Sequence, residues 1–321
     1  MNIFRLQYTA NPVYRQYVDT LHVEVRSIRS LETIPFLPIE FFKTRPVTTT
    51  PFEPEIIFES SGTTGERTSR HQVKKLSLYE KSFRGGFGQF YGDPSRWCIL
   101  ALLPGYLERT GSSLVYMADR LILLSRHPSS GFYLYDHDQL RRVLLDCQRA
   151  HQPVLLLGVT FALLDFAEGP PLQLQDTVVM ETGGMKGRRE ELTREEVHQV
   201  LCTRLGVPRI HSEYGMTELL SQAYSAGSGR FRCPPWMRIL IREENDPFAL
   251  VSAPAGNSAG GVVNVIDLAN LYSCSFIATD DIGRLHENDE FEILGRRDAG
   301  DIRGCSLLTA GRETFGLDKG T

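Results

Sequence analysis

The sequence lacks a long apolar run, an N-terminal secretory signal and an excess of positive charge. Its longest apolar segment, residues 153–167, is interrupted by Gly158 and Thr160 and is shorter than the roughly 20 residues of a membrane-spanning helix. No apolar core typical of a signal peptide follows Met1, so we expect a cytoplasmic protein without a membrane span. A net charge of −4 argues against nucleic acid as a partner, because its binding requires clustered positive charge.

The sequence also lacks any C-x-x-C pair. Its six cysteines are far apart in the chain: Cys98, Cys147, Cys202, Cys233, Cys274 and Cys305. This spacing argues against a zinc site and is typical of a reduced compartment. Most of these cysteines are expected to be small buried apolar residues.

A third absence concerns the loop at residues 58–71, FESSGTTGERTSRH. An ATPase P-loop needs a lysine directly after its second glycine, but alignment on Gly62 places Arg67 at that glycine and supplies no lysine. The core of the loop, SSGTTG, follows a short apolar run. Glycines allow close backbone approach, and hydroxyls and successive amides can surround phosphate oxygens. We therefore predict a phosphate-binding turn of another kind.

Helical and apolar segments alternate through the first two thirds of the chain. Helices are expected at residues 11–31, from Ser77 towards Gly86, from Asp138 to 150, and at 195–205 between the capping box Thr193–Glu196 and Gly206. Strands are expected at 55–58, 98–103, 154–158 and 208–215. This alternation predicts an α/β fold, a parallel sheet with helices on both faces. Ligands of such sheets bind at the carboxyl ends of the strands, where the glycine- and hydroxyl-rich turns occur.

From about residue 230 the pattern changes to short strands, with a turn at Asn288-Asp289. These strands predict an antiparallel sheet or a small barrel. We therefore divide the chain into an α/β nucleotide- and acid-binding core at 1–229, an antiparallel β subdomain at 230–295 and a short tail at 296–321.

Four motifs occur in a fixed order: SSGTTG at 60–65, SEYGMTE at 212–218, ATDDIGR at 278–284 and LGRRDAGDIRG at 294–304. Together they resemble the ATP-dependent adenylate-forming superfamily, which includes acyl-CoA synthetases and converts carboxylates to acyl-AMP. The segments LPIEFFK, SRH at 69–71, LPGYLERTGSSL and ETGGMKG are most similar to the acyl-protein synthetases of bacterial bioluminescence systems, the LuxE-type family. The resemblance implies parallel sheets flanked by helices and a small antiparallel, barrel-like subdomain.

The resemblance implies ATP and Mg²⁺ as cofactors and assigns residues to them. Thr217 would bind the α-phosphate, and Glu218 would ligate Mg²⁺, which favours carboxylate and phosphate oxygens. Tyr214 would pack on adenine, and Asp280 would accept hydrogen bonds from the ribose, with Asp281 as an open alternative. The remaining ATP-binding assignments are Ser60, Ser61, Gly62, Thr63, Thr64 and Gly65 for the β and γ phosphates, Gly183 and Gly184 for the approach of backbone to adenine, and Arg296.

The acid would occupy a neighbouring pocket. Its expected lining is Tyr106, Ser112, Ser113, Met117 and the turn at 158–161. The apolar members suit an alkyl or an aryl acid, and the choice between these stays open.

Two departures from the superfamily pattern affect these assignments. A Pro-Lys that usually follows the loop is replaced by Glu66-Arg67-Thr68, which leaves Arg67 or Arg70 as candidate substitutes. The chain ends soon after Asp298, without the C-terminal domain of about a hundred residues, so we expect that domain to be absent or vestigial. The resembling family is acylated on a cysteine near its C-terminus, which points to Cys305 as the nucleophile, beside Arg303.

The leading hypothesis is an acyl-protein synthetase that activates a carboxylic, in particular a fatty, acid as acyl-AMP and transfers the acyl group to a protein cysteine. Thr217, Glu218 and Cys305 would be its catalytic residues. The first alternative is an acyl-CoA ligase of the phenylacetate-CoA ligase type, and the second is a nucleotide-binding subunit without turnover. An acyl reductase or acyltransferase is the expected partner protein.

Overall fold

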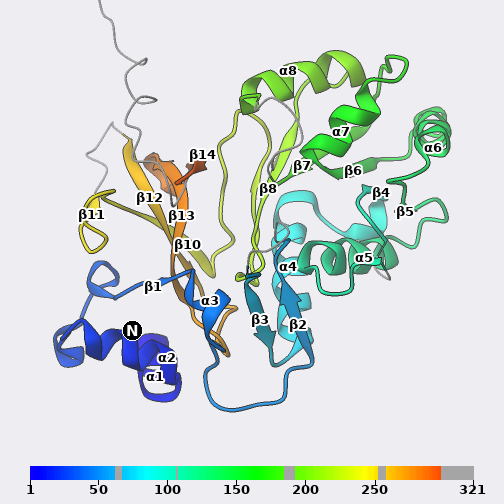
Figure 1. Ribbon diagram of the computed structural model, residues 1–321. Coiled ribbons are helices and arrows are strands. Elements are labelled where there is room, and N and C mark those ends of the chain that lie inside the picture. The colour runs from blue at the N-terminus through cyan, green and yellow to red at the C-terminus, as the bar shows by residue number, and fades with distance from the viewer. Residues whose placement is uncertain (62–66, 106–107, 184–191, 252–257, 298–321) are drawn as a thin grey trace, which may run out of the picture.

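The structure is a computed structural model, and it describes residues 1–61, 67–105, 108–183, 192–251 and 258–297. Two six-stranded sheets and one two-stranded ribbon run through these residues (Figure 1). Its α-helices are α1 (Asn2–Ala10), α2 (Pro12–Thr20), α3 (Phe41–Thr44), α4 (Leu76–Tyr91), α5 (Ser113–Ser125), α6 (His137–Arg149), α7 (Thr160–Ala167) and α8 (Arg194–Leu205). Not one of the helices in the described ranges is both long and apolar enough to cross a bilayer.

The first sheet has the order β5-β4-β6-β7-β8-β9. Its strands are β4 (Cys98–Leu102), β5 (Gly131–Phe132), β6 (Val154–Val159), β7 (Thr177–Thr182), β8 (His211–Tyr214) and β9 (Ala223–Ser225). All neighbours are parallel except β9, which is antiparallel to β8. Successive side chains of a strand point to opposite faces. Leu100 belongs to the apolar core that includes residues of α6, α7 and α8, and Ala101 belongs to the core that includes residues of α4 and α5. The predicted parallel sheet with helices on both faces is therefore confirmed.

The second sheet has the order β1-β13-β12-β10-β11, with β14 paired to β13. Its strands are β1 (Leu37–Pro38), β10 (Met237–Arg242), β11 (Leu250–Val251), β12 (Ala259–Asp267), β13 (Phe276–Leu285) and β14 (Phe291–Arg296). The pairings are antiparallel except that between β1 and β13. Asn288 and Asp289 have positive φ in the predicted turn between β13 and β14.

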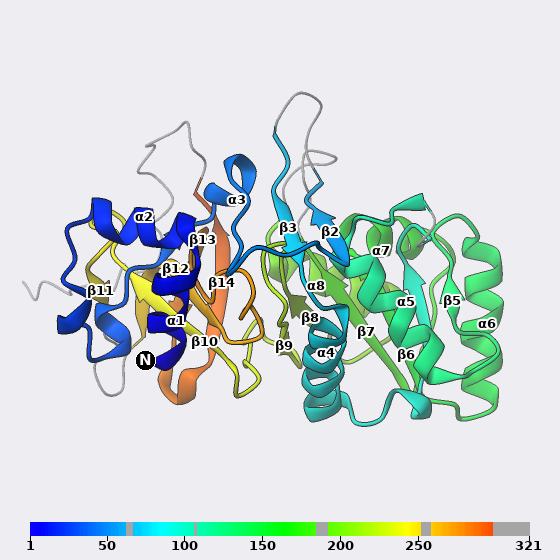
Figure 2. The same ribbon diagram turned by 90° about the horizontal axis from the view of Figure 1, so that it is seen from below.

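The N-terminal helices pack against the second sheet and not the first. The rings of Phe4 and Tyr14 lie 6.3 and 6.2 Å from that of Phe276 in β13, and one apolar core joins these helices to β10, β12 and β13. Figure 2 shows α1 and α2 beside this sheet, with the ribbon of β2 (Ile56–Glu59) and β3 (Arg70–Val73) between the two sheets. The division at residue 229 stays a prediction, but the first 47 residues contribute to the core of the second sheet.

The single helix predicted at 11–31 is wrong. Helix α1 ends at Ala10, and the side chain of Asn11 caps α2 by accepting a hydrogen bond of 3.0 Å from the amide of Tyr14. Pro12 occupies the first turn of α2, where its missing N–H costs nothing. Helix α2 ends at Thr20, and a left-handed backbone at His22 prevents it from continuing.

The capping box predicted at Ser77 and Glu80 is also wrong. Helix α4 begins at Leu76, whose amide donates to Glu55 Oε2 at 2.7 Å. Glu80 instead accepts a hydrogen bond from the hydroxyl of Tyr116. Glu55 therefore takes the place of the predicted local cap, and Tyr116 binds the carboxylate that was predicted to complete it.

Two other helix starts follow the sequence pattern more closely. The capping box of Thr193 and Glu196 is present, and Gly206 ends α8 with φ +69°, so both predictions are confirmed. Helix α6 begins at His137 with Asp136 as its cap, one residue before the predicted start at Asp138.

Candidate active site

The site is centred on Tyr214, the last residue of β8. Its hydroxyl donates a 2.8 Å hydrogen bond to Asp281 Oδ2 on β13, and its ring packs edge-on against Phe231 and Phe291. Burial and the nearby Asp281 carboxylate raise the pKa of Tyr214 well above its usual value, so the phenol remains a donor. This contact joins the carboxyl edge of the first sheet to the second sheet.

Glu218 follows this strand and is only 5% exposed. Burial raises the pKa of its carboxyl, while a hydrogen bond from Ser69 and the positive charge of Arg296 oppose that rise. Asn270 Nδ2 donates to the Glu218 carbonyl at 2.7 Å, which holds the backbone in place. A buried carboxylate is the kind of oxygen ligand that Mg²⁺ prefers, so the residues present fit this ion.

Ser69 also closes the base of the hydroxyl-rich loop. The amide of Ser60 donates to the Ser69 carbonyl at 3.1 Å, and the amide of Ser69 donates to Ser60 Oγ at 2.9 Å. The loop therefore leaves and re-enters the ribbon directly beside Glu218. Residues 62–66 lie outside the described residues, so the predicted contacts of Gly62, Thr63, Thr64 and Gly65 stay predictions.

Arg70, a candidate substitute for the missing lysine, pairs with Glu59. Its Nε lies 3.1 Å from Glu59 Oε1 across the ribbon, and both side chains are exposed. Exposed pairs of this kind contribute little stability, so the guanidinium can exchange partners at small cost.

His71 connects the ribbon to Thr217. Its Nδ1 donates to the Thr217 carbonyl at 2.8 Å, its ring meets Phe42 of α3 edge-on, and it is 1% exposed. Burial lowers the pKa of His71 to about 4, so the imidazole is neutral. The sequence pattern singled out SRH as a motif but contained no signal for this role, because Thr217 lies far away in the chain.

A pH titration tests the burial of His71. Below about pH 6.5 the unfolded chain binds a proton that the folded chain refuses until about pH 4, so acidification through this window favours unfolding. Because of His71, the free energy of unfolding should therefore fall by about 2 kcal/mol between about pH 7.5 and about pH 5. Urea unfolding should show this loss in the native chain and a smaller loss in His71→Gln.

His151→Asn is the matched control for this titration, because His151 is exposed and its left-handed backbone suits asparagine. It should retain the native pH dependence. An unchanged pH dependence in His71→Gln would contradict the proposed neutral state.

Gly183 lies at the end of β7 and has φ +64°. Thr160 Oγ1 lies 2.9 Å from its carbonyl oxygen and 3.1 Å from Glu181 Oε2. Burial raises the pKa of Glu181. The hydrogen bond to His198 and the charge of Arg194 lower it by more, so the net shift is downwards. A buried carboxylate network thus positions the turn predicted to approach adenine; Gly184 lies outside the described residues.

The aspartate nearest to Tyr214 is Asp281 and not Asp280. Arg296 Nε lies 3.9 Å from Asp281 Oδ1, on the same side as Glu218. Asp280 faces Arg297 Nη2 at 3.9 Å. The structure thus brings Tyr214, Glu218, Arg296 and Asp281 together, with Ser60 linked through Ser69.

The residues predicted for the acid lie around α5. Ser112 caps this helix by accepting from the amide of Val115 at 3.4 Å, and the Ser113 carbonyl accepts from Tyr79 at 3.0 Å. Met117 is buried in the core between α5 and the first sheet. These contacts serve capping and packing, so a role in acid binding stays a prediction. Tyr106 and Cys305 lie outside the described residues.

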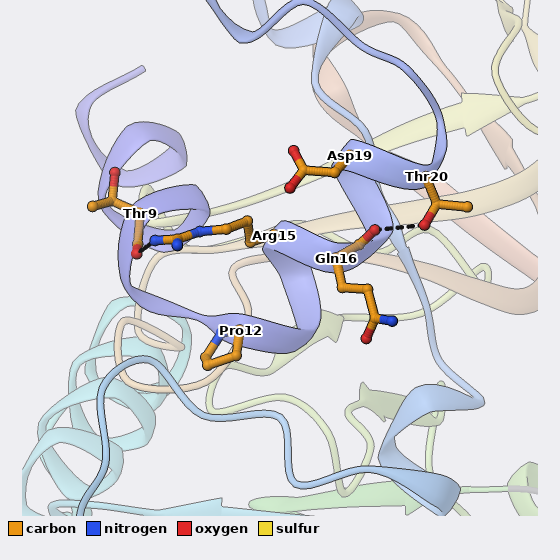
Figure 3. Close-up of a pocket in the computed structure, with 6 residues that line it drawn as sticks. All are labelled: Thr9, Pro12, Arg15, Gln16, Asp19 and Thr20. Carbon is orange, nitrogen blue, oxygen red and sulfur yellow. Dashed lines mark hydrogen bonds between the residues drawn. The ribbon is translucent and has the colours of Figure 1, made fainter.

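A surface hollow of about 500 Å³ lies away from this cluster, on α1 and α2. Figure 3 shows its lining of Thr9, Pro12, Arg15, Gln16, Asp19 and Thr20. Arg15 is held by the carbonyls of Tyr8 and Thr9, and Thr20 bonds to the Gln16 carbonyl. The hollow contains none of the predicted site residues.

The fold matches that of adenylate-forming enzymes. A 2-hydroxyisobutyryl-CoA ligase in the postadenylation state aligns with a TM-score of 0.61 and 12% identity, covering 92% of this chain and 65% of that one. The O-succinylbenzoate coenzyme A synthetase of Bacillus subtilis, in complex with ATP and magnesium, aligns with a TM-score of 0.52 and 17% identity, covering 77% and 51%. The chain thus spans about half to two thirds of these solved structures.

A curated relative is the long-chain-fatty-acid–luciferin-component ligase of Vibrio harveyi, 25% identical over 336 aligned positions that cover 95% of this chain and 84% of that protein. No family model matches the chain. The predicted resemblance to adenylate-forming enzymes, and within them to the bioluminescence ligases, is confirmed.

Proposed function

We propose that this protein activates a carboxylic acid with ATP, forming an acyl-adenylate, and then transfers the acyl group to a protein cysteine. The observation that carries the proposal is the convergence of the buried Glu218 carboxylate with Arg296, Asp281 and Tyr214 beside the base of the hydroxyl-rich loop. The name of the Vibrio harveyi relative supports a long-chain fatty acid as the substrate.

The first step joins two anions. A carboxylate oxygen attacks the α-phosphorus of ATP, a P–O bond forms, and the bond to pyrophosphate breaks. Ser60, Ser61 and the loop that follows would bind the β and γ phosphates, and Thr217 the α-phosphate. Glu218 would hold Mg²⁺, which neutralises charge on the phosphate oxygens. Arg296, close to Glu218 and Asp281, adds positive charge at the same place.

The nucleoside end would bind between the two sheets. Tyr214 offers its ring to adenine, Gly183 offers backbone, and Asp281 has a second carboxylate oxygen for the ribose. The contact of Asp281 with Tyr214 supports Asp281 over Asp280 for this role.

Paired substitutions test this choice. Asp281→Asn should raise the KM for ATP by roughly 10- to 100-fold, since a hydrogen bond to a charged group contributes about 1.5–3 kcal/mol. Asp280→Asn, one residue away on the strand, should change it by no more than about twofold, because that carboxylate faces Arg297. The reverse order of effects would restore Asp280 to the ribose.

The acceptor is proposed to be Cys305. It lies outside the described residues, and its support is the sequence resemblance and the name of the relative, a ligase of a long-chain fatty acid and a luciferin component. The partner that would take the acyl group onwards is an acyl reductase or acyltransferase. Its presence would be tested by co-purification.

Acid-dependent ATP–pyrophosphate exchange is the experiment that tests the proposal, because it reports adenylation without knowledge of the acceptor. We expect exchange with long-chain fatty acids that requires Mg²⁺. ATP binding without exchange across a broad panel of acids would instead support a nucleotide-binding subunit. Release of AMP that depends on added CoA would favour the acyl-CoA ligase.

A further inference from the structure

We propose that Cys98, His127 and Cys147 form a binding site for a zinc ion, separate from the candidate active site. Cys98 is the first residue of β4, His127 follows α5, and Cys147 lies near the end of α6. One ligand atom from each residue can be chosen so that all three lie within 4.8 Å of one another. The cluster is at the amino end of β4, whereas the candidate active site is at the carboxyl edge of the same sheet.

The donor set indicates the class of metal. Two cysteine sulfurs and one imidazole nitrogen select zinc and similar transition metals over Mg²⁺ or Ca²⁺. In a tetrahedral site with bonds of about 2.0–2.3 Å, ligand atoms are roughly 3.3–3.8 Å apart, so atoms within 4.8 Å of one another need to approach by at most roughly 1–1.5 Å. Three protein ligands leave one position for water.

Cys98 and Cys147 are both free and buried. A cysteine ligates a metal ion as thiolate, so each sulfur loses its proton when the ion binds. Binding of one ion as a bis-thiolate therefore releases two protons to solvent, and both sulfurs become ligands. The bound charge offsets the cost of burying thiolate.

His127 provides access and a replaceable hydrogen bond. It is partly exposed, unlike the two cysteines, so an ion can reach the cluster past its ring. Its Nδ1 accepts from the Ser129 amide at 3.2 Å, a long bond that a metal at Nδ1 would replace. A metal at Nε2 would require the tautomer with a proton on Nδ1 and would also end that bond.

The ion would join three segments that are distant in sequence. It would tie the first strand of the parallel sheet to α6 and to the turn that leads to β5, in the manner of a structural cross-link. The sequence spacing concealed the cluster, because no two of its members lie within a C-x-x-C motif.

Cobalt titration of the full-length reduced chain tests the site. The chain is first treated with a chelator and kept with a reductant that does not bind metal. One Co²⁺ ion should then bind per chain. It should produce a thiolate-to-cobalt charge-transfer band, and Zn²⁺ should displace it. Two protons should be released per ion, and zinc should raise the Tm.

Cys147→Ser should weaken cobalt binding at least tenfold, and so should His127→Gln, which replaces a less buried side chain. As a control, Cys202→Ser on α8 should bind cobalt like the native chain. Chelator-treated variants must show native-like circular dichroism, and His127→Gln covers the case in which Cys147→Ser does not fold. Absence of the band in the native chain, or equal affinity in His127→Gln, would overturn the proposal. Formation of a Cys98–Cys147 disulfide on mild oxidation without any metal uptake would identify a redox pair instead.

Discussion

Glu218→Gln is expected to reduce Mg²⁺-dependent ATP–pyrophosphate exchange by at least roughly 10²–10³-fold, the size of effect seen when one preorganised electrostatic group is removed. Glutamine has nearly the same volume as glutamate but carries no charge to hold the ion. Because burial raises the pKa of Glu218, the charged form is costly in the folded chain. Its neutral replacement should therefore leave the Tm unchanged or raise it.

Glu59→Gln is the matched control for this substitution. Glu59 stands at the entrance to the same loop, but its carboxylate is exposed and pairs with Arg70. Exchange in this variant should stay within about twofold of native, as exposed ion pairs contribute only about 0–1 kcal/mol. Native turnover in Glu218→Gln would remove Glu218 from the site, whereas equal losses in both variants would point to the loop as a whole.

Cys305→Ser is expected to abolish the covalent acyl adduct while leaving pyrophosphate exchange intact. The thiolate would attack the acyl carbonyl, form a thioester and release AMP, and serine is a much weaker nucleophile than cysteine at neutral pH. Intact-mass analysis after incubation with ATP, Mg²⁺ and a long-chain fatty acid should show one added acyl group in the native chain and none in the variant.

Cys202→Ser should acquire the adduct like the native chain and serves as the control for this experiment. An adduct that persists in Cys305→Ser would assign the acceptor to another residue. Exchange without any adduct would leave adenylation standing and exclude this chain as its own acceptor. The two halves of the proposed reaction can therefore fail separately.

Several features of the fold were predictable from local patterns. The alternation of helices with fully apolar strands predicted the first sheet, because strands buried on both faces occur in parallel sheets covered by helices. Thr193, Glu196 and Gly206 predicted the ends of α8, because a capping box and a left-handed glycine act within one turn of chain. The start predicted at Ser77 differs because a tertiary partner, Glu55, binds the first amide of α4. The helix predicted at 11–31 is shortened by local features, the cap at Asn11 and the left-handed backbone at His22.

Some residues of the candidate site were also predictable from local motifs, and others were not. The motif order alone predicted Tyr214, Glu218 and Arg296, which the structure brings together. The sequence could not choose between Asp280 and Asp281: neighbouring residues of a strand face opposite sides, and which side meets β8 depends on the packing of the two sheets. The link from His71 to Thr217 spans 146 residues, and local propensity carries no information about such a contact.

The sequence by itself determined the parallel sheet, the order of the four motifs and the position of the hydroxyl-rich loop, because each depends on periodicity or on residue types within a few positions. Only the tertiary structure decided that the N-terminal helices pack on the second sheet, that Asp281 meets Tyr214, and that Cys98, His127 and Cys147 converge. These outcomes depend on how the sheets and helices pack, so residues with no shared local pattern become neighbours.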